Sequence, residues 1–201
     1  MQNKQMRDAK AQSKRMVLAS ASPRRKELLE LMGLEFCIIP SKKEEVITKT
    51  EPSEIVKELA AQKAEDILNT ISEDVLVIGS DTIVVCDGEV MGKPADEESA
   101  FAMLHKLQGR THQVYTGVAV MQKENNKITS DIFAEKAEVT VCSMADEEIW
   151  WYIRRGESMD KAGAYGVQGS FGVFVKEIKG EYNTVLGLPI ASLYQVLKKY
   201  C

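Results

Sequence analysis

Short apolar runs alternate with amphipathic stretches along the chain, and this alternation predicts strands interspersed with helices. The predicted strands are residues 16–20, 35–40, 75–86, 89–91, 113–122, 128–142 and 172–178. The predicted helices are residues 24–32, 53–70, 96–107, 145–154 and 189–200. Mixed spacing of this kind is typical of an α/β fold whose sheet is partly antiparallel.

Turn residues divide these elements. Asp87-Gly88 lies between two apolar runs and predicts a hairpin, and the loop carrying Asn125-Asn126 predicts a second, longer one. Ser22-Pro23 has the order expected of an N-cap followed by proline in the first helical turn. Gly33 then marks the end of that helix.

One carboxylate interrupts the most apolar stretch of the chain. Asp81 lies in Ile78-Gly79-Ser80-Asp81-Thr82-Ile83-Val84-Val85, within the strand predicted from Val75. An ionised carboxylate buried without a partner costs several kcal/mol, so the fold must place a cation, a metal or hydrogen-bond donors beside it. Asp81 is therefore a functional-site candidate. The alternative is an aspartate that caps a strand-to-loop bend and bonds backbone N–H groups.

A second charge falls at an apolar position. Lys63 lies in the middle of the apolar stripe of the 53–70 helix. A lysine at such a position usually extends its ammonium to the edge of the apolar surface. The alternative is a cation directed into a cleft.

Basic residues cluster where a strand passes into a helix. Arg24 and Arg25 lie in the first predicted helical turn, directly after Ser20 and Ser22. Free N–H groups at a helix start, together with arginines, suit a phosphate chain. Lys93 stands similarly on the Gly92-Lys93-Pro94 turn. A solvated, charged helix start is the alternative.

The segment Asp160-Lys161-Ala162-Gly163-Ala164-Tyr165-Gly166-Val167-Gln168-Gly169 is too rich in glycine for a regular element. Such a loop can approach a ligand closely, and the amide of Gln168 can read the edge of a base. Its spacing matches neither the Walker nor the Rossmann phosphate loop. A purely structural loop is the alternative.

Composition limits the remaining possibilities. The 201 residues suit one large domain or two lobes, and 44% hydrophobic with 28% charged residues is typical of a globular protein. The net charge of −4 provides no basic footprint for nucleic acid, and no apolar run predicts a membrane span. Residues 1–15 are expected to form a flexible extension and residues 16–201 a single domain. Scattered single cysteines favour a reducing, cytoplasmic setting.

Five motifs occur in order from Val17 to Tyr200: LASASPRR, IGSDTIVV, GEVMGKP, DKAGAYGVQG and YNTVLGLP. In these motifs the chain resembles the Maf nucleotide pyrophosphatases. The resemblance implies an α/β fold similar to the inosine-triphosphate pyrophosphatases, with two lobes around a deep cleft. It also implies hydrolysis of nucleoside triphosphates to a monophosphate and pyrophosphate with a divalent metal, Mg²⁺ or Mn²⁺.

The resemblance also assigns residues to roles. Asp81 matches the proton acceptor, and Glu45 matches a loop carboxylate that would share the metal with Asp81. The positions associated with base preference are Arg24, Thr82 and Gln168. The polar positions of the cleft are Ser20, Arg25, Lys63 and Lys93. The pair SPRR and Y-x-V-Q-G resembles the dTTP/UTP branch rather than the 7-methyl-GTP branch.

Two other functions compete with an enzyme. A nucleotide-binding regulator of septum formation would need the cleft but would not need to activate water. Asp81 favours an enzyme over such a regulator, because a carboxylate that faces phosphates does little to strengthen binding alone. A DNA-binding protein is disfavoured by the acidic balance of charge. The expected partners are nucleoside triphosphates, without nucleic acid or membrane, and the resemblance is compatible with a homodimer.

Overall fold

The computed structural model describes residues 15–200. The expected N-terminal extension therefore lies outside the described residues, except for Arg15. That residue is the first of strand β1 (Arg15–Leu18), so the expected boundary was one residue too late. No described helix is long and apolar enough to cross a membrane.

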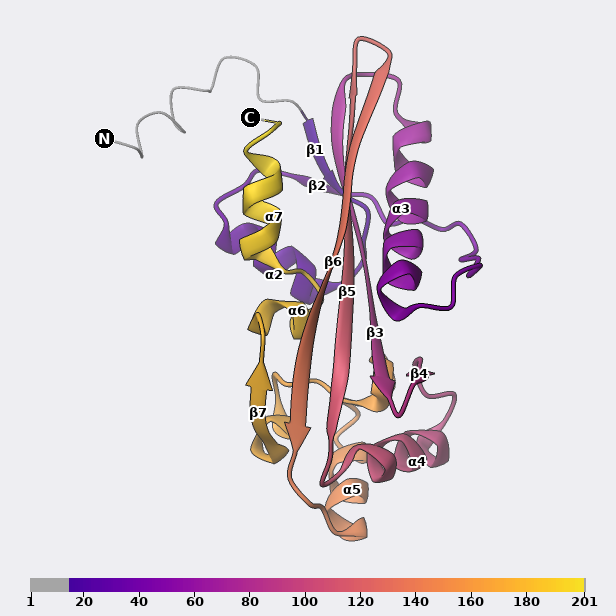
Figure 1. Ribbon diagram of the computed structural model, residues 1–201, viewed down its shortest axis with the longest axis vertical. Coiled ribbons are helices and arrows are strands. Elements are labelled where there is room, and N and C mark those ends of the chain that lie inside the picture. Colours follow the sequence, from indigo (N-terminus) through magenta and orange to yellow (C-terminus); the bar gives the residue numbers. More distant parts are fainter. Residues whose placement is uncertain (1–14, 201) are drawn as a thin grey trace, which may run out of the picture.

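A mixed seven-stranded sheet forms the centre of the molecule, in the order β2-β1-β3-β5-β6-β7, with β4 added to β3. β1 pairs in parallel with β2 and β3, and all other pairs are antiparallel. β3, β5 and β6 run along most of its length (Figure 1). Besides β1, the strands are β2 (Cys37–Ile38), β3 (Val75–Cys86), β4 (Glu89–Met91), β5 (Thr111–Glu124), β6 (Lys127–Val141) and β7 (Val175–Lys179).

The helices confirm the expected α/β order. They are α2 (Pro23–Leu31), α3 (Pro52–Thr70), α4 (Glu97–Leu107), α5 (Asp146–Ile153), α6 (Tyr182–Leu186) and α7 (Ile190–Leu197). Two 3₁₀ helices, η1 (Ala162–Ala164) and η2 (Ser170–Phe174), complete the chain. The strand expected at 172–178 was partly wrong, because η2 occupies its first residues and β7 begins at Val175. The short helix α6 was not predicted.

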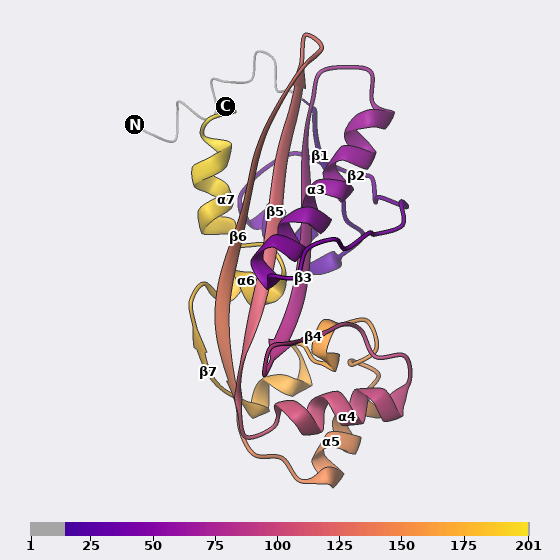
Figure 2. The same cartoon turned by 45° about the vertical axis from the view of Figure 1, so that its right-hand side comes forward.

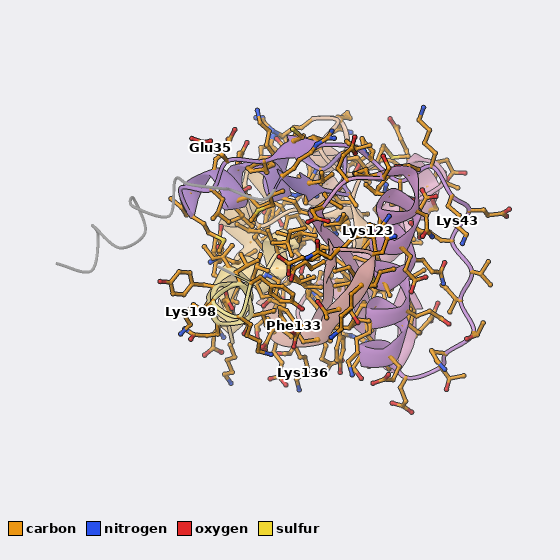
Figure 3. The ribbon with its side chains drawn as sticks, turned by 90° about the horizontal axis from the view of Figure 1, so that it is seen from above. Glu35, Lys43, Lys123, Phe133, Lys136 and Lys198 are labelled. Atoms are coloured by element: carbon orange, nitrogen blue, oxygen red, sulfur yellow. The ribbon has the colours of Figure 1, made fainter. Side chains whose placement is uncertain are left out.

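Two lobes share the long strands. In the upper lobe, α3 covers one face of the sheet while α2 and α7 cover the other (Figures 1 and 2). Viewed from above, α3 and the adjoining loop with Lys43 lie opposite α7 with Lys198 (Figure 3). In the lower lobe, α4, α5 and the 3₁₀ helices bury an aromatic core against β3, β5 and β6, centred on Tyr152 and Phe171.

Both predicted hairpins are confirmed. Asp87 and Gly88 join β3 to β4 with φ of 53° and 79°, and Asn125 and Asn126 join β5 to β6 with φ of 50° and 62°. Positive φ at both central residues gives the turn the twist that antiparallel strands require. The Asp87-Gly88 turn sets the register of β4 on β3, and the Asn125-Asn126 turn sets the register of β6 on β5.

One edge of β3 is left uncovered in its middle. β1 pairs with β3 only as far as Ile78, and β4 pairs with it only from Val84 onward. Residues 79–83 therefore have β5 on one side and no strand on the other. This gap in the sheet lies between the two lobes, and Asp81 stands at its centre.

Candidate active site

A cleft of about 810 Å³ opens at the uncovered edge of β3. That volume is within the range of pockets that hold small ligands. Both lobes contribute to its walls, so residues far apart in the sequence meet there. Every site residue expected from the sequence lines it: Ser20, Arg24, Arg25, Glu45, Lys63, Asp81, Thr82, Lys93 and Gln168.

Asp81 and Lys63 form an ion pair in the cleft, with side chains only 14% and 15% exposed. The ammonium of Lys63 donates to Asp81 Oδ1 and lies 2.9 Å from Glu45 Oε1. The interpretation in which Lys63 extends its ammonium to the edge of the apolar surface was therefore wrong, and the alternative, a cation directed into a cleft, is what the structure shows. Asp81 lies within β3 opposite Gly117, so the interpretation as a bend cap was wrong too.

Glycines on the strands allow this ion pair to form. A Cβ at Gly79 would lie 2.2 Å from the carbonyl oxygen of Ala60, and one at Gly117 would lie 2.1 Å from that of Val56. Helix α3 thus rests directly on the backbone of β3 and β5. This close approach brings the α3 side chain of Lys63 within reach of Asp81.

Arg25 is held by neutral acceptors. Its Nε donates to the carbonyl of Gly187 at 2.8 Å, Nη1 to Ser20 Oγ at 3.1 Å and Nη2 to Thr82 Oγ1 at 3.1 Å. Burial lowers the pKa of Arg25, and the nearby charge of Asp81 opposes that shift. No carboxylate in the described part of the chain lies within ion-pair distance of this guanidinium. The group is a fixed cation suited to an anionic ligand.

A chain of hydrogen-bonded hydroxyls, from Thr116 to Thr82, orients Arg25. Thr116 Oγ1 donates to the carbonyl of Thr184 at 2.7 Å, so its proton is committed to that bond. The 2.9 Å contact between Thr82 and Thr116 is then donated by Thr82. Thr82 in turn accepts from Arg25. The structure thus places Thr82, matched to base preference by resemblance, directly behind the guanidinium.

Ser20 and Ser22 form the turn that leads into α2. The backbone N–H of Ser22 donates to Ser20 Oγ at 3.2 Å. Ser22 is at the N-cap position and Pro23 follows it as expected, but its side chain makes no capping bond. The expected serine cap was wrong, because the turn takes its hydrogen bond from Ser20 instead.

The glycine-rich loop forms the lower wall. Tyr165 anchors it through a 2.6 Å hydrogen bond to the buried ring of His112. Burial lowers the pKa of His112 to about 4, so the imidazole is neutral at pH 7. Gln168 is exposed on this wall and forms no hydrogen bond within the described residues.

Two lining residues of this loop were not singled out from the sequence. Lys161 and Asp160 both line the cleft, and Lys161 Nζ donates to Asp160 Oδ1 at 2.5 Å and to the carbonyl of Glu157 at 2.7 Å. Their place at the start of the glycine-rich motif was the signal that could have identified them.

Arg24 and Lys93 complete the positive side of the cleft. Neither makes a hydrogen bond or an ion pair with another described residue, although both line its walls. Lys93 is exposed on the turn after β4, as its sequence predicted. These unpartnered cations stand on opposite lobes, so an anion in the cleft would be held from both sides.

Glu45 and Asp81 have the chemistry of a partial site for a hard cation. They converge on one ammonium, and Mg²⁺ is usually bound by one or two protein carboxylates together with substrate phosphates. Residues 15–200 contain no group of three or more histidines, cysteines or carboxylates that could enclose a metal. The pair therefore fits a divalent cation whose other ligands come from a phosphate chain and water.

Comparison with known proteins agrees with the motifs. A family model described as Maf-like protein matches residues 15–200. A protein of Agathobacter rectalis named dTTP/UTP pyrophosphatase is 48% identical over 197 residues, covering 92% of this chain and 96% of the relative. Proteins of the same name from Lachnoclostridium phytofermentans and Bacillus cereus (strain G9842) are each 47% identical, covering 92% and 93% of this chain and 94% and 96% of the relatives.

Two solved structures are similar to part of the chain. A nucleoside-triphosphatase, also named dITP/XTP pyrophosphatase, from Mycobacterium abscessus has a TM-score of 0.40 at 12% identity, covering 65% of this chain and 75% of its own. The Ham1 protein of Staphylococcus aureus has a TM-score of 0.38 at 15% identity, covering 66% and 73%.

Proposed function

The chain belongs to the Maf family, and we propose that it is a nucleoside triphosphate pyrophosphatase that hydrolyses dTTP and UTP. The products would be the nucleoside monophosphate and pyrophosphate. The observation that carries the proposal is the cleft in which Asp81 stands among Lys63 and the fixed guanidinium of Arg25. A carboxylate beside cations is the arrangement needed to activate water against a phosphate chain.

Asp81 is the proposed general base. Water attacks phosphorus at the α–β anhydride, the bond from that phosphorus to the bridging oxygen breaks, and the proton of the water passes to Asp81. The position of Asp81 suits this role because the uncovered edge of β3 leaves its carboxylate accessible from the cleft. The strand itself fixes the carboxylate, which keeps the base in place without ordering a loop.

The cations neutralise the charge of the phosphates. Arg25 is oriented by Ser20, Thr82 and Gly187, so it needs little reorganisation on binding. Lys63 and Lys93 reach the cleft from the two different lobes. Preoriented charges of this kind stabilise a phosphoryl transition state more than they stabilise the bound substrate.

A divalent cation, Mg²⁺ or Mn²⁺, completes the proposal. Glu45 and Asp81 would hold it together with phosphate oxygens. Such a cation would supply Lewis-acid chemistry: it would lower the pKa of a water molecule and neutralise phosphate charge. Lys63 pairs with both carboxylates in this structure. When a divalent cation replaces Lys63 as the partner of the carboxylates, the ammonium would be free to turn toward the phosphates.

Base selection is assigned to the lower wall and to α2. Gln168 offers an amide donor and acceptor that no described residue uses, which suits the O4 and N3 edge of uracil or thymine. Arg24 faces the same cleft from the other lobe. We propose a cytoplasmic setting and nucleoside triphosphates as the small-molecule partners; a homodimer is the assembly we propose.

The decisive experiment is the release of pyrophosphate from UTP, dTTP, CTP, GTP, ATP and 7-methyl-GTP, with Mg²⁺, with Mn²⁺ and with chelator. The proposal expects UTP and dTTP to be the best substrates and chelator to stop turnover. Tight binding of UTP without any pyrophosphate release would instead favour a nucleotide-binding regulator. Release of inorganic phosphate alone would show cleavage at a different anhydride.

A further inference from the structure

The loop of residues 41–50 carries Glu45 to the cleft, yet it has no regular structure. None of its residues makes a backbone-to-backbone hydrogen bond with the described chain. A segment held so weakly by its own backbone would normally be mobile, because nothing offsets its conformational entropy. Other groups must therefore keep Glu45 2.9 Å from Lys63.

Three side chains of α3 supply the missing bonds. Glu58 accepts from Thr48 through both oxygens, at 2.8 Å from the backbone nitrogen and 2.5 Å from the hydroxyl. Gln62 accepts from the N–H of Val46 at 3.0 Å and donates to its carbonyl at 2.6 Å. The amide of Gln62 thus takes the place of a neighbouring strand for one residue of the loop.

Asp66 holds the beginning of the same loop. One of its oxygens accepts from the hydroxyl of Ser41 at 2.7 Å and from the N–H of Lys42 at 3.3 Å. Glu58, Gln62 and Asp66 are spaced by four residues, which puts them on one stripe of the helix. From Ser41 to Thr48 the loop bonds first to Asp66, then to Gln62 and last to Glu58. The loop therefore runs antiparallel to α3.

The other face of the loop points toward the site. Val46 and Thr48 bond to α3, whereas Glu45 and Ile47 line the cleft. Alternation with a period of two is the geometry of an extended chain. Fixing the first pair of residues against α3 therefore sets the direction in which the second pair points.

We propose that Glu58, Gln62 and Asp66 are positioning residues that hold residues 41–50 as a strap, and that the strap places Glu45 for binding the cation and the triphosphate. The inference rests on the proposed function, since it gives a role to a carboxylate of that site. None of the three touches Asp81 or Arg25, so each acts through the strap. A hydrogen bond of this kind contributes roughly two- to tenfold to an equilibrium constant. Six of them hold the strap, five exposed and one partly buried.

The test compares Gln62→Ala and the double variant Glu58→Ala/Gln62→Ala with wild type. The backbone amide of Val46 should exchange with deuterium at least about tenfold faster in both variants, and that of Thr48 in the double variant, because the acceptors of these amides are then gone. Titration with Mn²⁺ in the presence of UMP and inorganic pyrophosphate should show about three- to tenfold weaker binding. The KM for the metal–UTP complex should rise by a similar factor, with kcat within about threefold of wild type.

Glu65→Ala is the matched control, because Glu65 is an exposed carboxylate of the same helix with no bond to the strap. It should resemble wild type in exchange, Mn²⁺ binding and KM. A double-mutant cycle with Glu45→Gln identifies the route of action. If Gln62 acts through Glu45, Gln62→Ala should weaken Mn²⁺ binding much less in the Glu45→Gln background.

Any of three results with these variants would overturn the inference. They are unchanged exchange at Val46 and Thr48, faster exchange with unchanged Mn²⁺ affinity and KM, and full additivity with Glu45→Gln. A wild-type protein that binds no Mn²⁺ with these ligands would also overturn it. A wild-type protein that binds Mn²⁺ but releases no pyrophosphate would refute the proposed function alone, and the exchange and Mn²⁺ measurements would still decide the role of the strap.

Discussion

The hydroxyls of Thr82 and Thr116 meet at 2.9 Å across paired strands β3 and β5, and Thr82 accepts from Arg25 on the other side. Thr116→Val keeps the shape but removes the acceptor for the Thr82 proton. Loss of this buried partner should lower the free energy of unfolding by about 1–3 kcal/mol and weaken binding of inorganic tripolyphosphate. Urea unfolding and calorimetry measure the two effects.

Thr116→Ser is the control for that prediction, because it keeps the hydroxyl and loses only a methyl group. It should restore most of the tripolyphosphate affinity even if some stability is lost. Equal affinities for the valine and serine variants would show that the hydroxyl chain does not orient Arg25.

Asp81→Asn should reduce pyrophosphate release from UTP by at least about 100-fold, because an amide cannot accept the proton of the attacking water. Nucleotide binding should be retained or improved, since a negative charge facing the phosphates is removed. Steady-state kinetics and nucleotide calorimetry on the same preparation measure both. Activity within tenfold of wild type would exclude Asp81 as the base.

Gln168→Ala should lower kcat/KM for UTP by about 1–3 kcal/mol, through loss of a hydrogen-bonded pair at the base edge. The kcat/KM values for GTP and ATP should change much less, because these purine nucleotides would not make that contact. Gln168 has no hydrogen bond within the described residues, so the substitution should leave stability nearly unchanged. An equal loss on every nucleotide would instead assign Gln168 to the phosphates or to the loop.

Gly117→Ala should displace α3 from the sheet. The added Cβ would lie 2.1 Å from the carbonyl oxygen of Val56, a backbone atom that cannot move alone. Since α3 carries Lys63 and holds the strap, both activity and stability should fall, the latter by about 1–3 kcal/mol. Thermal unfolding and UTP turnover test this. Gly33→Ala is the comparison, because no atom lies within 4 Å of the added Cβ. Alanine would still be strained at that position, where φ is +72°.

The buried ring of His112 predicts the dependence of stability on pH. Its pKa is about 4 in the folded protein and about 6.5 in the unfolded chain, so the unfolded state takes up the proton first as the pH falls. The contribution of the neutral His112 ring to the free energy of unfolding should therefore be complete above pH 7 and be lost as the pH falls from 6.5 to 4. The shift corresponds to about 3 kcal/mol at most.

Urea unfolding at pH 7.5 and pH 4.5 measures this loss against His112→Gln, which does not titrate. Carboxylates contribute to acid destabilisation in both proteins, so the difference between the two isolates the histidine. The wild-type protein should lose more stability than the variant over this interval. Parallel losses would show that His112 is protonated in the fold or that the fold has opened around it.

Much of the fold could be predicted from local pattern. The Asp87-Gly88 and Asn125-Asn126 turns require positive φ, which few residues tolerate, so their sequence alone indicated both hairpins. Helix α6 was missed because Tyr182–Leu186 is too short for a helical period to be seen. Likewise, η2 replaced part of an expected strand because apolar residues in a short run do not distinguish the two.

The candidate residues themselves were evident from the chain because a charge in an apolar pattern has few explanations. Asp81 interrupts a buried strand and Lys63 interrupts an apolar helical stripe, so both were identified before any contact was known. Sequence patterns also indicated that Arg25 follows a strand and that Gln168 lies in a glycine-rich loop. What each of these residues is, and which element carries it, are therefore local properties.

Their partners were decided only by the tertiary structure. Whether Lys63 reaches solvent or Asp81 depends on how closely α3 approaches β3 and β5, and Gly79 and Gly117 set that distance across the sheet. The three acceptors of Arg25 lie on different segments, the farthest of them 162 positions from Arg25 in the sequence. Such contacts depend on the path of the whole chain, because local periodicity specifies which face a side chain occupies and not what is packed against that face.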